Sequence, residues 1–367
     1  MHVLMTADTL GGVWTYTREL ATGLVRRGHR VTLISFGKCP SPGQKKWMDG
    51  LDGLRYWPTE YRVEWMQDSS EDVVKSAALL EQALRELSPD LLHLNQYAFG
   101  ALQTAIPKLV VAHSDVVSWW VSVHGCEPPD DSWTCWYREL VTQGINSADL
   151  VVAPSQWMLD ALKTSYTVPA DSRVIYNART ASLFEPDASK ENCVFTVGRL
   201  WDQAKQVSLL LERKHSVPVY VAGSQAHPEK LAVGTYDREE TGAVRFLGEQ
   251  SEERLRDLYA QSAIYCETSC YEPFGLAPLE AALSGCAVIA NDIPSFRELW
   301  GDAVCYFRRN DAGSLAARIE VLSRDSRLRR HYANRAMERA RAIFQLDRML
   351  DSYEAAYNRL VKQEAYA

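Results

Sequence analysis

The 367-residue sequence has no long apolar run, and none of its hydrophobic segments approaches the length of a membrane span. Biased tracts are also missing, because 46% hydrophobic and 24% charged residues is the composition of an ordinary globular protein. Met1 leads directly into apolar residues, which leaves no room for a signal peptide. We therefore expect a cytoplasmic protein with one very large or two ordinary domains.

Metal-binding and disulfide patterns are missing as well. The eight cysteines are scattered, and neither Cys126/Cys135 nor Cys266/Cys270 has a second pair at metal-like spacing. We interpret them as reduced, mostly buried thiols. The sequence also contains no Asp-x-Asp motif of the kind that holds a metal ion beside a phosphate, so we expect neither a metal ion nor another cofactor.

The sequence has no excess of positive charge, because its 47 acidic residues outnumber its 40 lysines and arginines. The net charge is −7 and the sequence pI is about 5.7, which argues against a nucleic-acid partner. A peripheral membrane contact is compatible with the sequence but not indicated by it. The arginines between residues 324 and 341 are interleaved with acidic residues, and a solvated helix face explains them better than a nucleic-acid site.

The dinucleotide fingerprint Gly-x-Gly-x-x-Gly is missing at the N-terminus, although the setting would suit it. Residues 2–6 are typical of a buried strand, 13–27 of a helix and 30–36 of a second strand, which is a Rossmann-like opening. The turn between the first strand and the helix contains only Gly11-Gly12. A dinucleotide site is therefore disfavoured, and a plain tight turn is the alternative to a ligand-binding loop.

Strands and helices continue to alternate along the first half. Further strands are expected at 91–94, 109–112, 150–153 and 174–176, and helices at 70–87, 99–105, 137–146 and 156–162. Residues 38–68 interrupt this rhythm with a long aromatic loop, which is either a flap over a bound substrate or a satellite apolar cluster. Residues 127–136 are expected to form another loop, at the rim of the site.

Two polar residues stand directly after strands of this half. Asn95 follows 91–94 and His113 follows 109–112, and ligand-binding residues belong at the carboxyl ends of parallel strands. His124 is a second candidate, but the segment before it is a less clean strand than the one before His113. A structural role is the alternative for either histidine.

The second half repeats the alternation after a polar, proline-containing boundary at 180–192. Strands are expected at 193–197, 217–222, 244–248, 264–266, 287–290 and 304–307, with helices at 252–262, 315–322 and 325–344 and another ending at 283. The chain is thus predicted to be an α/β protein of two Rossmann-like domains, residues 1–179 and 190–345, that face each other across a cleft.

Two cations follow the first strand of the second half. Gly198 lets the backbone approach a ligand, Arg199 offers a planar fork to phosphate, and Lys205 offers a mobile point charge. Such a pair suits a diphosphate group when no metal ion is present. Ordinary surface cations are the alternative.

The richest segment is residues 271–280, in which Glu272 and Glu280 lie on either side of Phe274-Gly275-Leu276. Pro278 is tolerated in the first turn of a helix. Free N–H groups at the start of such a helix attract an anion. We interpret the segment as a clamp whose carboxylates hold hydroxyl groups while its backbone amides hold phosphate. A buried strand–helix unit with two solvent-facing glutamates is the alternative.

This run and the Gly-Arg-Leu…Lys segment resemble the donor-sugar and diphosphate signatures of glycosyltransferase family 4. The resemblance implies retaining, metal-independent transfer from a nucleotide diphosphate sugar on a GT-B fold. It also implies that a last helix, about 346–367, crosses back to the first domain. Where the family usually shows Asn-Gly, this sequence has Asn177-Ala178, a less permissive backbone.

The same resemblance assigns roles to single residues. The catalytic pair would be His113 and Glu272, and the sugar and ribose hydroxyls would be held by Glu272 and Glu280. Donor phosphate would be bound by Gly12, Arg199, Lys205, Phe274, Gly275 and Leu276. Weaker expectations concern the nucleobase (Arg245, Phe246, Leu247) and the acceptor (Trp14, Asn95, His124).

Other activities stay open on the sequence alone. A nucleotide-sugar 2-epimerase shares the fold and needs no acceptor, and a sugar phosphorylase would use free phosphate. A non-catalytic nucleotide-sugar sensor is disfavoured by the intact charged residues. The acceptor of a transferase could be a glycan, a lipid-linked molecule or a small molecule.

Overall fold

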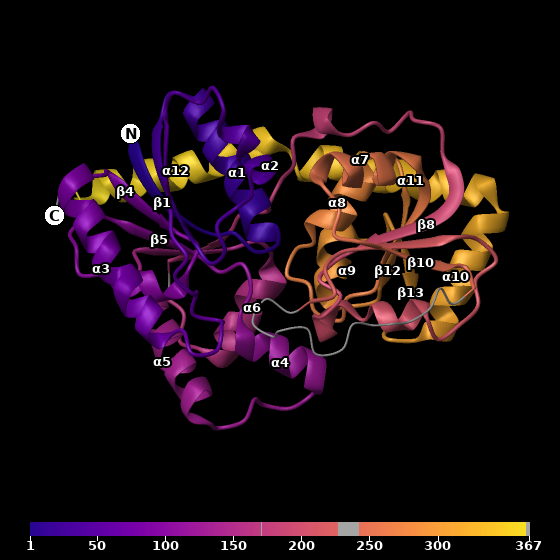
Figure 1. Cartoon of the computed structure of the whole chain (residues 1–367), viewed down its shortest axis with the longest axis horizontal. Coiled ribbons are helices and arrows are strands. Elements are labelled where there is room, and N and C mark those ends of the chain that lie inside the picture. The colour runs from indigo at the N-terminus through magenta and orange to yellow at the C-terminus, as the bar shows by residue number, and fades with distance from the viewer. Residues whose placement is uncertain (170, 227–241, 365–367) are drawn as a thin grey trace. The chain divides into compact units, whose positions relative to one another are not determined.

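The computed structural model describes residues 1–169, 171–226 and 242–364 of the chain. The chain forms two compact units (Figure 1). The first comprises Met1–Ala178 together with the C-terminal segment that begins at Leu346, and the second is Arg179–Gln345.

The first unit is built on a sheet of seven parallel strands in the order β3-β2-β1-β4-β5-β6-β7. The strands are β1 (His2–Asp8), β2 (Arg30–Phe36), β3 (Leu54–Pro58), β4 (Leu91–Leu94), β5 (Lys108–Val111), β6 (Leu150–Ala153) and β7 (Ser172–Val174). Central strands are continuous apolar runs because both faces of the sheet are covered. Val3, in the interior strand β1, pairs with Val31 on one side and Leu91 on the other.

Helices cover both faces of this sheet and give it two separate cores. They are α1 (Gly12–Arg26), α2 (Pro42–Lys45), α3 (Ser70–Leu87), α4 (Val116–His124), α5 (Ser132–Asn146), α6 (Gln156–Ser165) and α12 (Leu346–Glu364). The core with α3, α5 and α6 lies on one face, and the core with α1 and α12 lies on the other.

The last helix, α12, packs against α1 although more than 300 residues separate them in sequence (Figure 1). A Cβ on Gly23 of α1 would lie 2.5 Å from Leu350 Cδ2, so the absence of a side chain permits the close approach. Tyr353 and Tyr357 are fully buried. The return of the final helix to the first unit is therefore confirmed, and the expected residues 365–367 of that helix lie outside the described residues.

The second unit has six parallel strands in the order β10-β9-β8-β11-β12-β13. They are β8 (Glu191–Val197), β9 (Val219–Ala222), β10 (Val244–Gly248), β11 (Ser262–Glu267), β12 (Ala287–Asn291) and β13 (Cys305–Phe307). Its helices are α7 (Glu252–Gln261), α8 (Leu276–Leu283), α9 (Pro294–Trp300), α10 (Ala312–Arg324) and α11 (Ser326–Ile343). This is the Rossmann strand order, and its direction reverses between β8 and β11, where ligands bind in such sheets.

Three expectations for local structure were wrong in part. Residues 38–68 contain α2, a 3₁₀ turn and the edge strand β3, because their tryptophans pack against both cores of the unit. That favours the satellite cluster over the flap. The helix expected at 99–105 is a 3₁₀ turn at Tyr97–Ala101, where a Cβ on Gly100 would lie 2.1 Å from the Gly144 carbonyl oxygen. The loop expected at 127–136 ends early, since Asp131 caps α5 by accepting from the Thr134 amide.

No helix within the described ranges combines the length and the apolarity needed to cross a membrane. The same residues contain no group of three or more histidine, cysteine or acidic side chains placed to hold a metal ion.

Candidate active site

The loop after β11 is fastened to the segment after β8. The Thr268 hydroxyl donates to the Lys205 carbonyl at 2.6 Å, and the Cys270 amide donates to the Ala204 carbonyl at 2.8 Å. Asn291, at the end of β12, donates its side-chain amide to the Thr268 and Ser269 carbonyls at 3.3 and 3.2 Å. The two segments that carry the predicted phosphate and sugar ligands are thus held at one edge of the sheet, beside its switch point.

Lys205 and Glu272 form an ion pair in this region. Glu267 is buried beneath them and accepts from the Ser269 amide and hydroxyl at 3.2 and 2.5 Å. Burial raises the pKa of Glu267, and Lys205 opposes that shift. Burial alone would lower the pKa of Lys205, but Glu272 and Glu267 outweigh it and raise the pKa, so the ammonium stays charged. The arrangement places a fixed positive charge next to Glu272, the carboxylate that we predicted to bind sugar hydroxyls.

Arg199 lies in the same segment and is 42% exposed. Its guanidinium pairs with Asp202 at 2.7 Å and lies 5.2 Å from the centre of the Trp201 ring. A guanidinium in this position retains donors that can reach an anionic ligand from solvent. Arg199 and Lys205 therefore present two cations from one short segment after β8.

The α8 helix begins at the predicted amide site. Gly275 precedes it with φ +85°, and a Cβ there would lie 2.9 Å from Pro278 Cγ and 3.2 Å from Glu272 Cγ. Among the described residues, no side-chain hydrogen bond caps the N-terminus of this helix. Phe274 is buried against Phe344 at a ring distance of 5.2 Å, which anchors the turn in the unit's interior. The backbone amides of residues 274–276 thus lie in a rigid turn that a glycine makes possible.

Glu280, on α8, has a partner that the sequence did not single out. Arg179 is 1% exposed and pairs through Nε with Glu280 at 2.8 Å, and its terminal nitrogen lies 3.3 Å from Glu252. A buried guanidinium between two carboxylates fixes the orientation of Glu280. In the sequence, Arg179 is a lone arginine directly after Asn177-Ala178, and no motif spacing indicated its role.

Glycines join the loop after β8 to the loop after β9. Gly223 has φ +130°, and a Cβ there would lie 1.8 Å from the Gly198 carbonyl oxygen. The Gly198 amide in turn donates to Ala222 at 3.2 Å. Contact between two backbones leaves no room for a side chain, so this position can only be glycine without local rearrangement.

Substituting Gly223 by alanine is expected to reduce the free energy of unfolding by about 3 kcal/mol or more, because strain and a backbone clash coincide. Gly248→Ala is the matched control: it has φ +69° but nothing within 4 Å of an added Cβ, and should lose only about 1 kcal/mol. Urea denaturation measures both. Equal losses in the two variants would contradict the close backbone contact.

The residues expected to contact the nucleobase lie on β10, an edge strand of the sheet. Arg245 is exposed, and Phe246 and Leu247 are partly buried. No hydrogen bond or ion pair connects the three to Lys205 or Glu272 in the described part of the chain. Their role stays a prediction.

His113 and Asn95 meet in the first unit. His113 Nε2 and Asn95 Oδ1 are 2.8 Å apart, and the Asn95 side-chain amide donates to the Thr6 carbonyl at 2.7 Å. The Tyr16 ring stands edge-on to His113 at 4.5 Å. Because the Asn95 oxygen accepts, His113 Nε2 carries the proton in this arrangement. His113 and Asn95, which we predicted separately at the ends of two strands, therefore belong to one hydrogen-bonded network.

A second histidine, His93, belongs to the same network. Its imidazole lies 3.1 Å from the Tyr16 hydroxyl and 2.7 Å from the Tyr357 hydroxyl of α12. Burial lowers the pKa of His113 to about 3 and that of His93 also to about 3. Both imidazoles are neutral at neutral pH, so His113 can donate or orient but does not act as a cation.

These two histidines make folding pH-dependent in a defined direction. The folded pKa values lie below the unfolded value of 6.5, so protons bind preferentially to the unfolded chain below that pH. We expect the free energy of unfolding to fall as the pH is lowered from 6.5 towards 3, with His93 alone contributing about 1.4 kcal/mol per pH unit. Denaturation at several pH values should show a shallower slope for His93→Gln. The exposed His124 provides the control, and an equal slope in His93→Gln and wild type would contradict the assignment.

The other candidates of the first unit are not brought to His113. Trp14 is buried, donates to the Gln44 carbonyl at 3.2 Å and packs against Trp47, so it ties residues 42–48 to α1. His124 ends α4 and lies 4.3 Å from the Trp120 ring, on an exposed surface. Gly12 is the first residue of α1, directly after the turn that follows β1.

Comparison with known proteins bears on this arrangement. The protein-family model described as "Glycosyltransferase Family 4" matches residues 10–180 of the sequence. A second family model, described as "Glycosyl transferases group 1", matches residues 180–339. The chain belongs to glycosyltransferase family 4. It is an enzyme, a glycosyltransferase of the hexosyltransferase type, with the two-domain α/β GT-B fold.

Curated relatives of this glycosyltransferase include two bacterial mannosyltransferases. It is 28% identical to O-antigen chain mannosyltransferase RfbU of Salmonella typhimurium, over 54% of this chain and only 59% of that relative's length. It is 26% identical to phosphatidyl-myo-inositol mannosyltransferase of Mycolicibacterium smegmatis, over 90% of this chain and 86% of that protein.

Solved structures share the fold at lower identity. Sucrose-phosphate synthase from Thermosynechococcus elongatus superimposes with a TM-score of 0.78 at 18% identity, covering 99% of this chain and 100% of that one. Anabaena Alr3699/HepE in complex with UDP and glucose gives a TM-score of 0.74 at 18% identity, covering 98% and 100%.

Proposed function

We propose that this glycosyltransferase moves a hexosyl group from a nucleotide diphosphate sugar to a hydroxyl acceptor, with retention of the anomeric configuration and without a metal ion. The observation that carries the proposal is the joining of the loops after β8 and β11, with Lys205, Glu272 and the α8 amides in one region. Arg199 and Lys205 supply the positive charge that a departing diphosphate needs.

Each acidic residue has a separate task in this proposal. Glu272 holds hydroxyls of the transferred sugar, and its pairing with Lys205 places sugar and phosphate recognition side by side. Glu280, oriented by Arg179, holds the ribose hydroxyls. Neutral His113 orients the sugar near its reacting carbon by hydrogen bonding, which agrees with its lowered pKa.

In this proposal, retention follows because the acceptor attacks the sugar on the same face from which the diphosphate leaves. The departing phosphate oxygen takes the acceptor's proton, so no protein nucleophile is required. Cationic side chains and helix amides stabilise the charge that develops on that oxygen.

Mannose is the transferred sugar that we propose first, because the relatives described above carry mannosyltransferase in their names. By the same reasoning we propose a glycan or lipid-linked acceptor. Alr3699/HepE was solved in complex with UDP and glucose, but its identity to this chain reflects the fold alone, so uridine and guanosine donors are both tested.

A thermal-shift panel of GDP, UDP, GDP-mannose and UDP-glucose tests the donor, because binding to the folded state raises its apparent stability. Transfer to an acceptor library, with NMR of the product's anomeric proton and with EDTA present, tests retention and metal independence. A product with inverted anomeric configuration would overturn the proposed retention. Activity abolished by EDTA and restored by a divalent cation would overturn the proposed metal independence. Donor turnover without acceptor would indicate an epimerase, and strict phosphate dependence a phosphorylase.

A further inference from the structure

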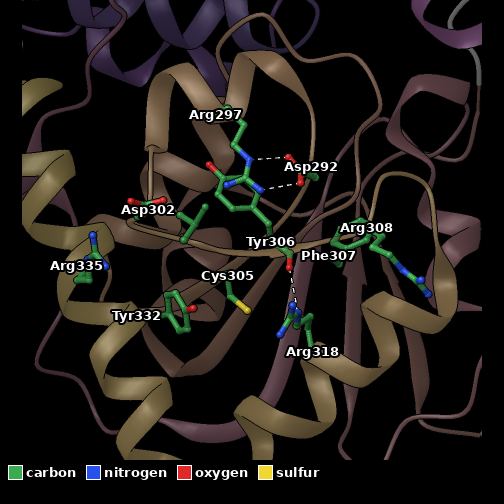
Figure 2. Close-up of a pocket in the computed structure, with 11 residues that line it drawn as sticks. Asp292, Arg297, Asp302, Cys305, Tyr306, Phe307, Arg308, Arg318, Tyr332 and Arg335 are labelled. Atoms are coloured by element: carbon green, nitrogen blue, oxygen red, sulfur yellow. Dashed lines mark hydrogen bonds and ion pairs between the residues drawn. The ribbon is translucent and has the colours of Figure 1, made fainter.

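Outside the donor loops, polar side chains gather in a surface cavity of the second unit and in the network around His113. The cavity lies beside β13 and measures about 340 Å³, but Arg318 and Arg335 lie on opposite sides of Tyr332 in it (Figure 2). In the network, by contrast, each link to His113 is a hydrogen bond or a ring contact of known length. The network therefore has the defined geometry that the cavity lacks.

The orientation of the Asn95 side chain follows from its neighbours. Its amide nitrogen Nδ2 lies 2.7 Å from the Thr6 carbonyl oxygen, which can only accept a hydrogen bond. Nδ2 also lies 3.4 Å from Thr17 Oγ1, so both of its protons have partners inside the protein. Oδ1 therefore faces His113 Nε2, and Nε2 carries the imidazole proton. Asn95 is 8% exposed, and its amide protons are not available to a ligand.

The other ring nitrogen of His113 has the opposite character. Because the imidazole is neutral and its proton is on Nε2, Nδ1 carries a lone pair and accepts a hydrogen bond. Nδ1 has no hydrogen-bond partner among the described residues. His113 is partly exposed, whereas Tyr16, His93 and Asn95 are buried. An ionised phosphate or an ether oxygen has no proton to donate, so Nδ1 favours a hydroxyl group.

Tyr16 restrains the plane of the His113 ring. The two ring centres are 4.5 Å apart with an interplanar angle of 69°, which is an edge-to-face contact. The Tyr16 hydroxyl lies 3.1 Å from His93 Nε2, and His93 Nδ1 lies 2.7 Å from the Tyr357 hydroxyl of α12. Because Tyr16 is 1% exposed and both His93 and Tyr357 are fully buried, the Tyr16 ring has little freedom to move away from His113.

We propose that Asn95 and Tyr16 are positioning residues for His113, which together present Nδ1 as the acceptor of a hydrogen bond from a hydroxyl of the transferred sugar. Asn95 fixes the tautomer of the imidazole, and Tyr16 fixes its ring plane. This assignment rests on the proposed function, in which His113 orients that sugar. It adds that His113 accepts a hydrogen bond from the substrate and does not donate one to it.

Nitrogen NMR spectra of the free enzyme, labelled on its histidine nitrogens, test the tautomer without any substrate. His113→Gln identifies the His113 signals by their loss. At about pH 8, where exposed histidines are neutral, we expect a protonated Nε2 and an unprotonated Nδ1 in wild type. Asn95→Ala should instead give the averaged signals of both tautomers, as exposed His124 does in the same spectrum. A protonated Nδ1 in wild type, or an unchanged His113 spectrum in Asn95→Ala, would overturn the proposal.

Initial-rate kinetics test the orientation of the ring. Tyr16→Leu should lower kcat at least about tenfold and change the donor KM less than about twofold, because a displaced His113 ring affects the reacting geometry more than donor binding. Tyr16→Phe keeps the ring and should retain at least about a third of kcat. Tyr56→Leu is the control, because Tyr56 packs against the same core and contacts Ser35 Oγ at 2.8 Å. Equal losses of kcat in Tyr16→Leu and either of the other two variants would overturn the proposal.

Asn95→Ala provides a second route if Tyr16→Leu does not fold. It leaves the ring packing around His113 in place and should show the same loss of kcat with little change in the donor KM. An unchanged thermal midpoint in Tyr16→Phe and Tyr56→Leu verifies that these variants are folded. Wild-type kcat in Asn95→Ala would overturn the proposal.

Deoxy analogues of the donor sugar identify the hydroxyl that Nδ1 recognises. Removing that hydroxyl should lower kcat/KM at least about tenfold in wild type and have no further effect in His113→Phe. Equal losses for every analogue in the two enzymes would overturn the proposal. Wild-type kcat in His113→Phe would overturn the function proposed for His113 itself. A lowered kcat in His113→Phe, together with an unchanged His113 spectrum in Asn95→Ala, would overturn the positioning alone.

Discussion

Lys205→Ala is expected to lower kcat for sugar transfer by about 10²–10³-fold, because it removes a fixed charge from a departing diphosphate in a partly enclosed site. The side chain is 19% exposed, and both Glu272 and Glu267 hold its ammonium in the charged form. An interaction that strengthens as charge develops affects kcat more than the Michaelis constant of the donor. Initial-rate kinetics with the donor identified by thermal shift measure the effect.

The loss must be separated from misfolding, since removing one member of an ion pair leaves the other uncompensated. Lys205→Met/Glu272→Gln removes both charges at similar volume and should recover stability without recovering transfer. Lys214→Ala is the matched control, because Lys214 is an exposed lysine of the same unit. Wild-type turnover in Lys205→Ala would remove Lys205 from the donor site.

Arg179→Met is expected to destabilise the protein by about 3–5 kcal/mol, because Glu280 loses a buried cation that lies 2.8 Å away. Nucleotide binding should weaken at least about tenfold in the same variant, since Glu280 is no longer oriented. Chemical denaturation and calorimetry with the donor nucleotide measure the two effects.

The second substitution Glu280→Gln distinguishes the two effects. In Arg179→Met/Glu280→Gln the buried charge is gone, so stability should return while nucleotide affinity stays low. Arg254→Met serves as the control, because Arg254 is half-exposed and 3.8 Å from its partner Asp257. Nucleotide affinity equal to wild type in Arg179→Met would show that Arg179 acts only on folding.

Much of the fold could be predicted because strand and helix patterns are local. Buried parallel strands appear as short apolar runs, and glycine or proline marks their ends. Prediction failed where packing between distant segments overrode local pattern. The stretch 38–68 was interpreted as a loop, yet β3 within it pairs with β2. The segment before His124 was assessed as a poor strand, and it is helix α4, capped by Asp115.

In the candidate site, too, local motifs could be predicted and contacts between distant segments could not. Arg199, Lys205, Glu272 and Glu280 could be predicted as site candidates because their spacing is confined to short runs of sequence. Arg179 and Asn291 were missed because each contacts a segment 22 or more residues away, α8 for Arg179 and the loop after β11 for Asn291.

The sequence by itself determined the α/β class, the two-domain division, the family and the short charged motifs, since all of these are written in contiguous segments. Only the tertiary structure decided which partners those charges have: Lys205 with Glu272, Glu280 with Arg179, and His113 with Asn95. It also brought Arg318 and Arg335, which come from separate helices, to the lining of one surface cavity of the second unit. Pairing and cavity formation depend on contacts between residues far apart in the chain, and no local pattern encodes them.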